Sequence, residues 1–271
     1  MNDSKLVHGI NAEVSNKVYH GDKSFLSSSN LKLLLKDPNQ FYKEVILGDY
    51  ESVDNPNFDI GSYVHAALLE PHKITEEFAM FDGWKKYGNA WEQFKEEHKG
   101  KIILSKPQLF KCNQYVSSTV QRKEAQFLLK HGLPEHTMTS KILDVPVKVR
   151  ADYINIEAGY IVDVKTTSHE SGIDIFRQTS SHYYYDLSAA LYCQVAHDNY
   201  KKLFDFYFIV ISKNDLQCHV YKASSNFLIQ GHALVNKALV KYKKCLETGD
   251  WTRDPATVIL PHFGDYEILE V

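Results

Sequence analysis

The chain has 271 residues, of which 44% are hydrophobic and 24% are charged; this composition allows a sizeable core and argues against global disorder. Its formal net charge of -3 does not indicate a nucleic-acid binder, although a basic groove can coexist with an acidic exterior. The four cysteines form no CxxC pair, which argues against a zinc ribbon or an iron–sulfur cluster. No apolar run has the length of a signal peptide or membrane span, so we expect a reduced, cytoplasmic protein with free thiols and no membrane partner.

The N-terminal half is predicted to be mainly helical. Residues 1–24 are polar and irregular, and we expect them to form a flexible arm. The segment Ser27-Ser-Ser-Asn30 can cap a helix that begins in the apolar run Leu31–Leu35. Further helices are expected over 41–47, 60–69 and 107–130, with breaks at Pro38, Pro71 and Gly132.

The C-terminal half is predicted to combine strands with two helices. Strands rich in β-branched and aromatic residues are expected over 137–143, 145–154, 160–166, 203–212 and 216–223. The run 203–212 is nearly all apolar, as in a buried central strand, and 216–223 can pair with it as a hairpin. Helices are expected over 183–196 and 225–248.

These elements predict an α/β fold with a mixed central β-sheet flanked by helices and an N-terminal helical portion that arches over a cleft. We expect a single domain over 25–271. Within it, residues 25–130 would form the helical portion, and residues 131–271 the sheet core with its closing helix.

The most informative motif is an acid and a lysine two residues apart on an apolar strand. Asp163 and Lys165 leave the same face of this strand, where burial without a partner is costly. Asp152 lies eleven residues earlier, so a hairpin can bring the two carboxylates together. Adjacent carboxylates repel each other unless a cation lies between them, and oxygen ligands favour Mg²⁺ or Mn²⁺ over zinc. The motif indicates metal-assisted phosphodiester hydrolysis, with Lys165 orienting or deprotonating the attacking water.

A simpler interpretation of this motif is a surface hairpin with an ion pair between Asp163 and Lys165, because the motif also occurs by chance. The nearby acids Asp144 and Glu157 are expected to be solvated loop charges.

His65 is a second candidate residue, on a predicted helix one turn from Gly61 and Ser62. A lone helical histidine is more often a core residue than a ligand. Here the small neighbours allow close backbone approach, and the apolar neighbours can bury the imidazole.

Five segments, taken in series, carry a family resemblance. They are 27–38, 61–71, 150–152, 162–167 and 185–192. In this order they resemble the exonuclease VIII-type (RecE-type) nucleases of phages and prophages, a branch of the PD-(D/E)XK superfamily that is similar in architecture to RecB-like nuclease domains. The resemblance runs from about residue 25 to about residue 195. It implies a restriction-endonuclease-like core.

The resemblance also implies a metal site that binds Mg²⁺ or Mn²⁺. The carbonyl oxygen of Val164 would be one of its ligands. The side chains that match are the helical histidine His65, the first acid Asp152, the bridging acid Asp163, the catalytic lysine Lys165 and, just before the first strand, the accessory acid Glu135.

The resemblance also implies DNA contacts, on the predicted helix 183–196 and at the end of the predicted strand 160–166. Tyr192 matches the tyrosine of the family's QxxxY motif, whereas Ser188 stands where RecB-like members commonly have glutamine. Core packing is a nearly equal alternative for Tyr192. Thr166 and Thr167 could hold a phosphate or simply end the strand. Tyr185 belongs to a run of three tyrosines that cannot all be buried, so at least one is expected to border the cleft.

A basic and aromatic segment is a further candidate for DNA binding, since stacking aromatic rings among cations suit single-stranded ends. A solvated helical face over an apolar underside explains the same pattern. The residues are Trp84, Lys85, Lys86, Tyr87, Trp91, Phe94, Lys95 and Lys99. Four lysines of the last helix carry the same ambiguity: Lys237, Lys241, Lys243 and Lys244.

The resemblance implies a Mg²⁺-dependent exonuclease that degrades linear duplex DNA from its ends, in the 5′-to-3′ direction, for phage recombination. It further implies a single-strand annealing recombinase as partner and a homo-oligomer. One alternative is a structure-specific or single-strand endonuclease of the same superfamily. The other is a non-catalytic DNA-binding or inhibitor protein that retains the fold, and the intact acids and lysine argue against it.

Overall fold

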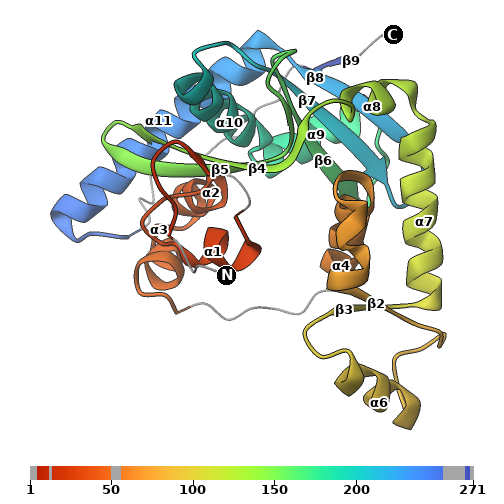
Figure 1. The fold of residues 1–271 in the computed structure, drawn as a ribbon. Helices are drawn as coiled ribbons and strands as arrows, with labels where there is room; N and C mark the ends of the chain where they lie inside the picture. Colours follow the sequence, from red (N-terminus) through yellow and green to blue (C-terminus); the bar gives the residue numbers. More distant parts are fainter. Residues whose placement is uncertain (1–4, 12–13, 50–55, 253–265, 269–271) are drawn as a thin grey trace.

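A seven-stranded β-sheet forms the centre of the molecule, and helices pack against both of its faces (Figure 1). The computed structural model describes residues 5–11, 14–49, 56–252 and 266–268. The strand order is β1-β4-β5-β6-β7-β8-β9. The predicted α/β class, with a mixed sheet between helices, is confirmed.

The strands of this sheet are β1 (Ile10–Asn11), β4 (Leu133–Ile142), β5 (Val145–Asn155), β6 (Tyr160–Thr167), β7 (Asp205–Ser212), β8 (Cys218–Ala223) and β9 (Tyr266–Ile268). The longer helices are α2 (Ser28–Lys36), α4 (Pro56–Leu69), α6 (Asn89–Glu97), α7 (Lys106–Gln121), α9 (Ile173–His182), α10 (Tyr185–Tyr200) and α11 (Ser225–Thr248). The shorter ones are α1 (Asn16–Gly21), α3 (Pro38–Phe41), α5 (Ile74–Glu77) and α8 (Lys123–Leu128), with a π-helical turn η1 (Tyr42–Ile46) and a 3₁₀ turn η2 (Pro71–Lys73).

The sheet is mixed because one connection is a crossover. β6 and β7 are parallel, and α9 and α10 connect them, as parallel neighbours require. The remaining pairs are antiparallel, including the predicted hairpin of β7 and β8. The predicted helix 183–196 corresponds to α10. The preceding helix α9 was not predicted.

Each face of the sheet has its own hydrophobic core. On β6, Ile161 packs with α2, α10 and α11, whereas Val162 and Val164 pack with α4 and α7. β7 alternates in the same way and is buried from Phe206 to Ser212, which confirms it as a central strand. Because side chains alternate along a strand, Asp163 and Lys165 belong to the face that α2 and α10 cover.

The sheet divides near Asp152. β5 pairs with β6 over three residues only, Tyr153–Asn155 against Tyr160–Val162, although both strands continue beyond this point. β5 pairs with β4 along almost its whole length, from Val145 to Ile154, so beyond Tyr153, toward Val145, it pairs with β4 alone. The two halves therefore diverge where Asp152 and Asp163 face each other, and this divergence gives access to their side chains.

The expected flexible arm over 1–24 differs from the structure. β1 pairs with β4, and the capped helix α1 places Tyr19 in a small cluster with Leu6 and Phe25. The sequence pattern did not indicate this packing, because these apolar residues are scattered and contact partners far along the chain. Residues 1–4 and 12–13 of this arm lie outside the described residues, as do 253–265 and 269–271 of the expected domain.

One further prediction about the helical portion needs correction, and another unit within this portion was not predicted. The single helix expected over 107–130 is two helices, α7 and α8, because Arg122 has extended backbone angles between them. The charged segment 72–106 forms a small parallel pair, β2 (Phe78–Phe81) with β3 (Ile102–Ser105), that carries α6. This unit extends below α4 and α7, away from the main sheet (Figure 1).

Candidate metal-dependent active site

Three acidic residues lie side by side on three neighbouring strands. The β4–β5 register pairs Pro134 with Tyr153 and continues past Asp152, which places Glu135 opposite Asp152. The β5–β6 register pairs Tyr153 with Val162, which places Asp163 on the other side of Asp152. The prediction that the hairpin brings Asp152 and Asp163 together is therefore supported by the strand register.

Asp152 is held by contacts from β6 and α4. Its Oδ2 atom accepts a hydrogen bond from the backbone N–H of Val164 at 2.7 Å and lies 3.7 Å from Nδ1 of His65. His65 Nε2 forms a 2.7 Å hydrogen bond with the carbonyl oxygen of Val164. Since a carbonyl only accepts, Nε2 carries the proton, and a neutral ring then presents the lone pair of Nδ1 to Asp152.

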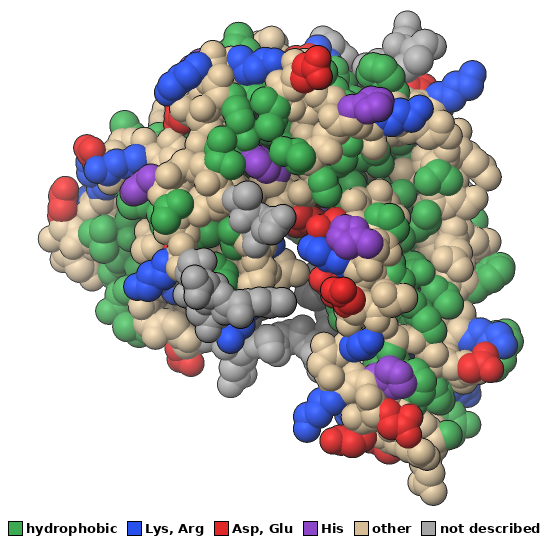
Figure 2. Space-filling view, in the orientation of Figure 1, with side chains coloured by type: hydrophobic (Ala, Val, Ile, Leu, Met, Phe, Trp, Pro, Cys, Tyr) green, Lys and Arg blue, Asp and Glu red, His purple; other side chains and the backbone are tan. Residues whose placement is uncertain are grey.

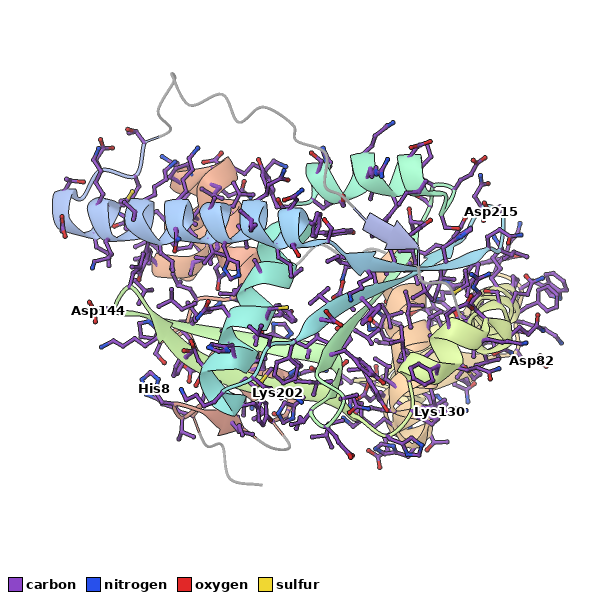
Figure 3. All side chains as sticks on the ribbon, turned by 90° about the horizontal axis from the view of Figure 1, so that it is seen from above. His8, Asp82, Lys130, Asp144, Lys202 and Asp215 are labelled. Carbon is purple, nitrogen blue, oxygen red and sulfur yellow. The ribbon has the colours of Figure 1, made fainter. Side chains whose placement is uncertain are left out.

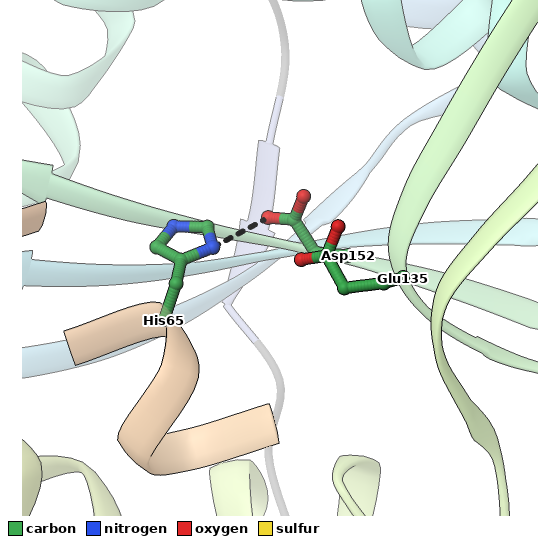
Figure 4. A group of neighbouring side chains, drawn as sticks. All are labelled: His65, Glu135 and Asp152. Atoms are coloured by element: carbon green, nitrogen blue, oxygen red, sulfur yellow. Dashed lines mark ion pairs between the residues drawn. The ribbon is translucent and has the colours of Figure 1, made fainter. Parts of the chain in front are cut away.

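His65, Glu135 and Asp152 converge from a helix and two strands (Figure 4). One potential ligand atom of each lies within 4.8 Å of those of the other two. Two half-buried carboxylates and an imidazole lone pair at one place repel each other unless a proton or a cation lies between them. This donor set fits a divalent cation.

Glu135 belongs to β4, which begins at Leu133, and not to the segment before the first strand as predicted. Its φ of 47° is in the left-handed region, an uncommon conformation for a residue other than glycine in a strand. Burial, followed by repulsion from Asp152, raises the pKa of Glu135 to about 8. Burial and the neighbouring Asp163 also raise the pKa of Asp152.

Asp163 forms a 2.5 Å ion pair with Lys165. Burial alone would lower the pKa of Lys165, but the carboxylates of Asp163 and Asp152 outweigh it and raise that pKa. Lys165 is therefore a cation at neutral pH. The structure thus contains the ion pair of the simpler interpretation, but its partners are largely buried beside Asp152 rather than on the surface.

A cavity of about 850 Å³ connects this cluster with the N-terminal segment. Asp152, Glu135 and Tyr192 line it together with residues of α1 and the first turn of α2. Figure 2 shows the molecule hollowed beside α4, with acidic, basic and histidine side chains at the edge of the hollow.

Two basic residues of β5 line the same cavity and were not predicted as site residues. Lys148, Arg150 and Asp152 alternate along the strand and so share a face. Lys148 Nζ donates to the backbone oxygens of Tyr19 and Asp22, and the Arg150 guanidinium lies 4.3 Å from the centre of the Tyr19 ring. The spacing of Lys148, Arg150 and Asp152 was a usable signal in the sequence.

The predicted DNA-contacting residues lie around the site in different environments. Tyr192 lines the cavity and packs edge-on against Phe206. Tyr185 lies over the site, with Lys165 Nζ 5.4 Å from its ring centre. Ser188 is half-buried on α10, and Thr166 and Thr167 end β6 with half-exposed side chains. Their contacts with DNA remain predictions.

Other candidates from the sequence lie away from the site. Asp144 is exposed at the periphery in the turn after β4 (Figure 3), and Glu157 is exposed as well, as expected for solvated loop charges. The basic and aromatic segment surrounds α6, where Trp84 and Tyr87 are exposed and Lys86 donates to the carbonyl of Ile103. The four cysteines are free and buried.

The sheet, its facing acids and the lysine two residues after Asp163 define a PD-(D/E)XK-like domain. The chain belongs to the family described as PDDEXK-like domain of unknown function (DUF3799), which it matches over residues 27–256. No curated protein matches the sequence. Among the described residues, no helix combines the length and apolar character needed to cross a bilayer.

The chain is similar in fold to a solved protein of Eubacterium rectale described as a "Putative exonuclease". The TM-score is 0.63 at 15% sequence identity, over 91% of this chain and 97% of that chain. At this identity the likeness shows the fold alone. A second solved structure, described as SSO0001, has a TM-score of 0.32 at 12% identity over 80% of this chain and 85% of that chain, which is too low to carry an argument.

Proposed function

We propose that this protein is a divalent-metal-dependent nuclease that hydrolyses phosphodiester bonds in DNA. The observation that carries the proposal is the row Glu135, Asp152 and Asp163, with His65 on one side and Lys165 on the other. Membership of a PDDEXK-like family supports it. So does the description of the Eubacterium rectale protein as an exonuclease.

His65, Asp152 and Glu135 would hold the cation, with Asp163 as a further acid beside them. A bound Mg²⁺ or Mn²⁺ would polarise the scissile phosphate and lower the pKa of a bound water. The carbonyl of Val164, a predicted ligand, accepts a hydrogen bond from His65 in this structure, and its second lone pair could bind the cation.

Lys165 would act as a hydrogen-bond donor and positive charge rather than as a proton acceptor. Its ammonium is stabilised by Asp163 at 2.5 Å, so it is protonated before the substrate binds. A fixed cation beside the reacting phosphate can orient a water and stabilise the negative charge that develops in the transition state. Two roles of Lys165 were predicted from the sequence, to orient the attacking water or to deprotonate it. Its protonated state favours the first.

We further propose that the substrate is linear duplex DNA, degraded from its ends in the 5′-to-3′ direction. The same proposal includes a homo-oligomer. It would act beside a single-strand annealing recombinase in phage recombination. It rests on the resemblance of five sequence segments to exonuclease VIII-type nucleases. The cavity beside Asp152 is consistent with a strand end reaching the acids.

One digestion experiment tests the hydrolysis, its dependence on metal, its direction and its need for a DNA end. Linear duplex labelled at the 5′ or the 3′ end, and a covalently closed circle, are incubated with the protein with and without Mg²⁺ or Mn²⁺. We expect metal-dependent release of mononucleotides from the 5′ end and an intact circle. Cleavage of the circle would instead identify an endonuclease. No hydrolysis of any DNA with either metal would contradict the proposed function.

A further inference from the structure

Lys32 is a basic residue near the site, and the family resemblance assigns it no role. It lies on α2, which packs against the sheet face that carries Asp163 and Lys165, and its side chain is half-buried. Its ammonium is 5.3 Å from the centre of the Tyr185 ring. Lys165 Nζ lies 5.4 Å from the centre of the same ring. Lys32 and the predicted catalytic lysine therefore both lie against the Tyr185 ring.

The charges around Lys32 are those of the site. Burial, followed by repulsion from Lys165, lowers the pKa of Lys32 to about 7, and attraction to Asp163 and Asp186 only partly compensates. Within the described residues, Lys32 forms no ion pair or hydrogen bond, whereas Asp163 is paired with Lys165 at 2.5 Å. A half-buried ammonium without a paired anion is costly to the folded protein.

The face of α2 that carries Lys32 also borders the cavity. Ser28 and Ser29 line the cavity with Asp152, and Lys32 follows them at spacings of four and three residues, so all three share one side of the helix. Tyr192 lines the same cavity as Ser28 and Ser29. A strand that enters the cavity toward Asp152 would therefore pass along this side of α2.

We propose that Lys32 contacts a phosphate oxygen of the bound strand beside Lys165 and is a substrate-binding residue of this site. The proposal rests on the proposed nuclease function. Two ammonium groups near one aromatic ring repel each other, and an anion that both can reach removes this repulsion. A backbone phosphate carries one negative charge and presents two free oxygens to the ammonium groups.

The test measures DNA binding without cleavage. The background is Asp152→Asn, because Asp152 is not among the charges acting on Lys32, whereas Asp163 and Lys165 are and stay intact. Fluorescence anisotropy with a short labelled duplex, in EDTA, gives the affinity at several KCl concentrations. The variants are Lys32→Met, Lys32→Arg and, as a matched control, Lys36→Met, which removes an exposed lysine one turn further along α2.

We expect Lys32→Met to weaken binding about 3- to 10-fold and to reduce the slope of log affinity against log salt by about 0.9, the value for one phosphate contact. Lys32→Arg should keep the slope, and Lys36→Met should change neither quantity. A thermal melt of each variant verifies folding. If Lys32→Met does not fold, Lys32→Arg still tests the proposal, because an altered salt slope in that variant would contradict it.

The proposal is overturned if Lys32→Met binds with the parent slope, or if Lys36→Met lowers the slope equally. These outcomes are separate from failure of the proposed function. A parent protein that hydrolyses DNA while Lys32→Met keeps the parent slope refutes the role of Lys32 alone. A parent that neither binds nor hydrolyses DNA refutes both.

Discussion

Asp163 and Lys165 form a largely buried ion pair directly beside Asp152. Removal of one partner leaves the other charge buried and unpaired, so such pairs are sensitive to substitution. In the proposed reaction the same two residues supply an acid at the metal site and a fixed positive charge. Their loss should therefore affect catalysis far more than binding.

We expect Asp163→Ala or Lys165→Ala to lower metal-dependent hydrolysis at least about 100-fold, because a pre-positioned charge is lost at the reacting phosphate. Binding of DNA ends should remain largely intact. The measurement is hydrolysis of labelled linear duplex, with a thermal melt to verify folding and Asp163→Asn as a less disruptive variant.

A matched control for this pair is the exposed ion pair between Lys141 and Asp144 in the turn between β4 and β5. Lys141→Ala and Asp144→Ala should hydrolyse DNA at the parent rate. If the Asp163 and Lys165 variants also degraded linear duplex at the parent rate, the assignment of the site would be wrong.

In the proposed metal site, Glu135 would make the metal affinity depend on pH. Its pKa of about 8 in the folded, metal-free protein is well above its ordinary value, so the folded protein holds a proton here that the unfolded chain releases. The contribution of this proton to the stability of the folded state is fully present below about pH 4.3 and is lost as the pH rises through about 8. Metal binding needs the carboxylate and must displace this proton.

We therefore expect Mn²⁺ affinity to rise by up to about tenfold per pH unit between pH 6 and pH 8, with release of close to one proton from Glu135. Calorimetry in two buffers of different ionisation enthalpy measures the proton release. Glu135→Gln should weaken binding and flatten this dependence. Glu157→Gln, an exposed acid on the next turn of the sheet, should behave like the parent. A steep dependence that persists in Glu135→Gln would assign the proton to another group.

At the scale of elements, the packing of α10 against α11 positions the helix that carries Tyr185 and Tyr192. The closest approach is at Gly231 on α11, where a Cβ atom would lie 2.1 Å from the carbonyl oxygen of Asp186. Backbone atoms cannot move aside as a flexible side chain can. The glycine is therefore required by the helix contact.

Gly231→Ala should destabilise the protein by about 1–3 kcal/mol, since the added methyl group forces α10 and α11 apart. Gly61 on α4 is the matched control, because a Cβ there would meet only Thr166 Oγ1 at an ordinary 3.5 Å. Gly61→Ala should be neutral or stabilise by up to about 1 kcal/mol through helix propensity. Urea denaturation measures both changes, and equal changes in the two variants would contradict this account of the helix contact.

At the scale of the whole molecule, the N-terminal segment is attached to the sheet through the basic residues of β5. The Arg150 guanidinium donates to the Asn16 side chain at 2.5 Å and to the Val14 carbonyl at 2.9 Å. Tyr19, which is 7% exposed, lies against both Lys148 and Arg150. This segment forms one wall of the cavity beside Asp152.

Tyr19→Ala should cost about 2–4 kcal/mol, because it removes a buried ring and two cation–π contacts. Amide hydrogen exchange should increase over residues 14–22 more than over β6 and β7, since this ring is the segment's buried contact with Lys148 and Arg150. Tyr87→Ala is the control, as Tyr87 is 72% exposed and should change neither measurement. Unchanged exchange over 14–22 would show that other contacts hold the segment.

Much of the fold followed from local pattern in the sequence. The helix over 225–248 was predicted from its amphipathic pattern with the bounds that α11 has. In the structure Ser224 caps this helix and Gly249 ends it. The apolar run of β7 identified a central strand in the same way. Asp163 and Lys165 were located because two residues at a spacing of two must share one strand face.

Tertiary structure decided which distant residues join these. Glu135 reaches Asp152 through strand register and a left-handed backbone, neither of which is encoded in local spacing. Lys32 and Tyr19 lie near the acids only because α2 and α1 fold over a sheet formed more than 100 residues later in the chain. Periodicity reports which side of an element is buried, whereas contacts between elements depend on how their faces pack together. The sequence therefore identified the strand that carries the acids, and the packing of the elements built the surroundings of the site.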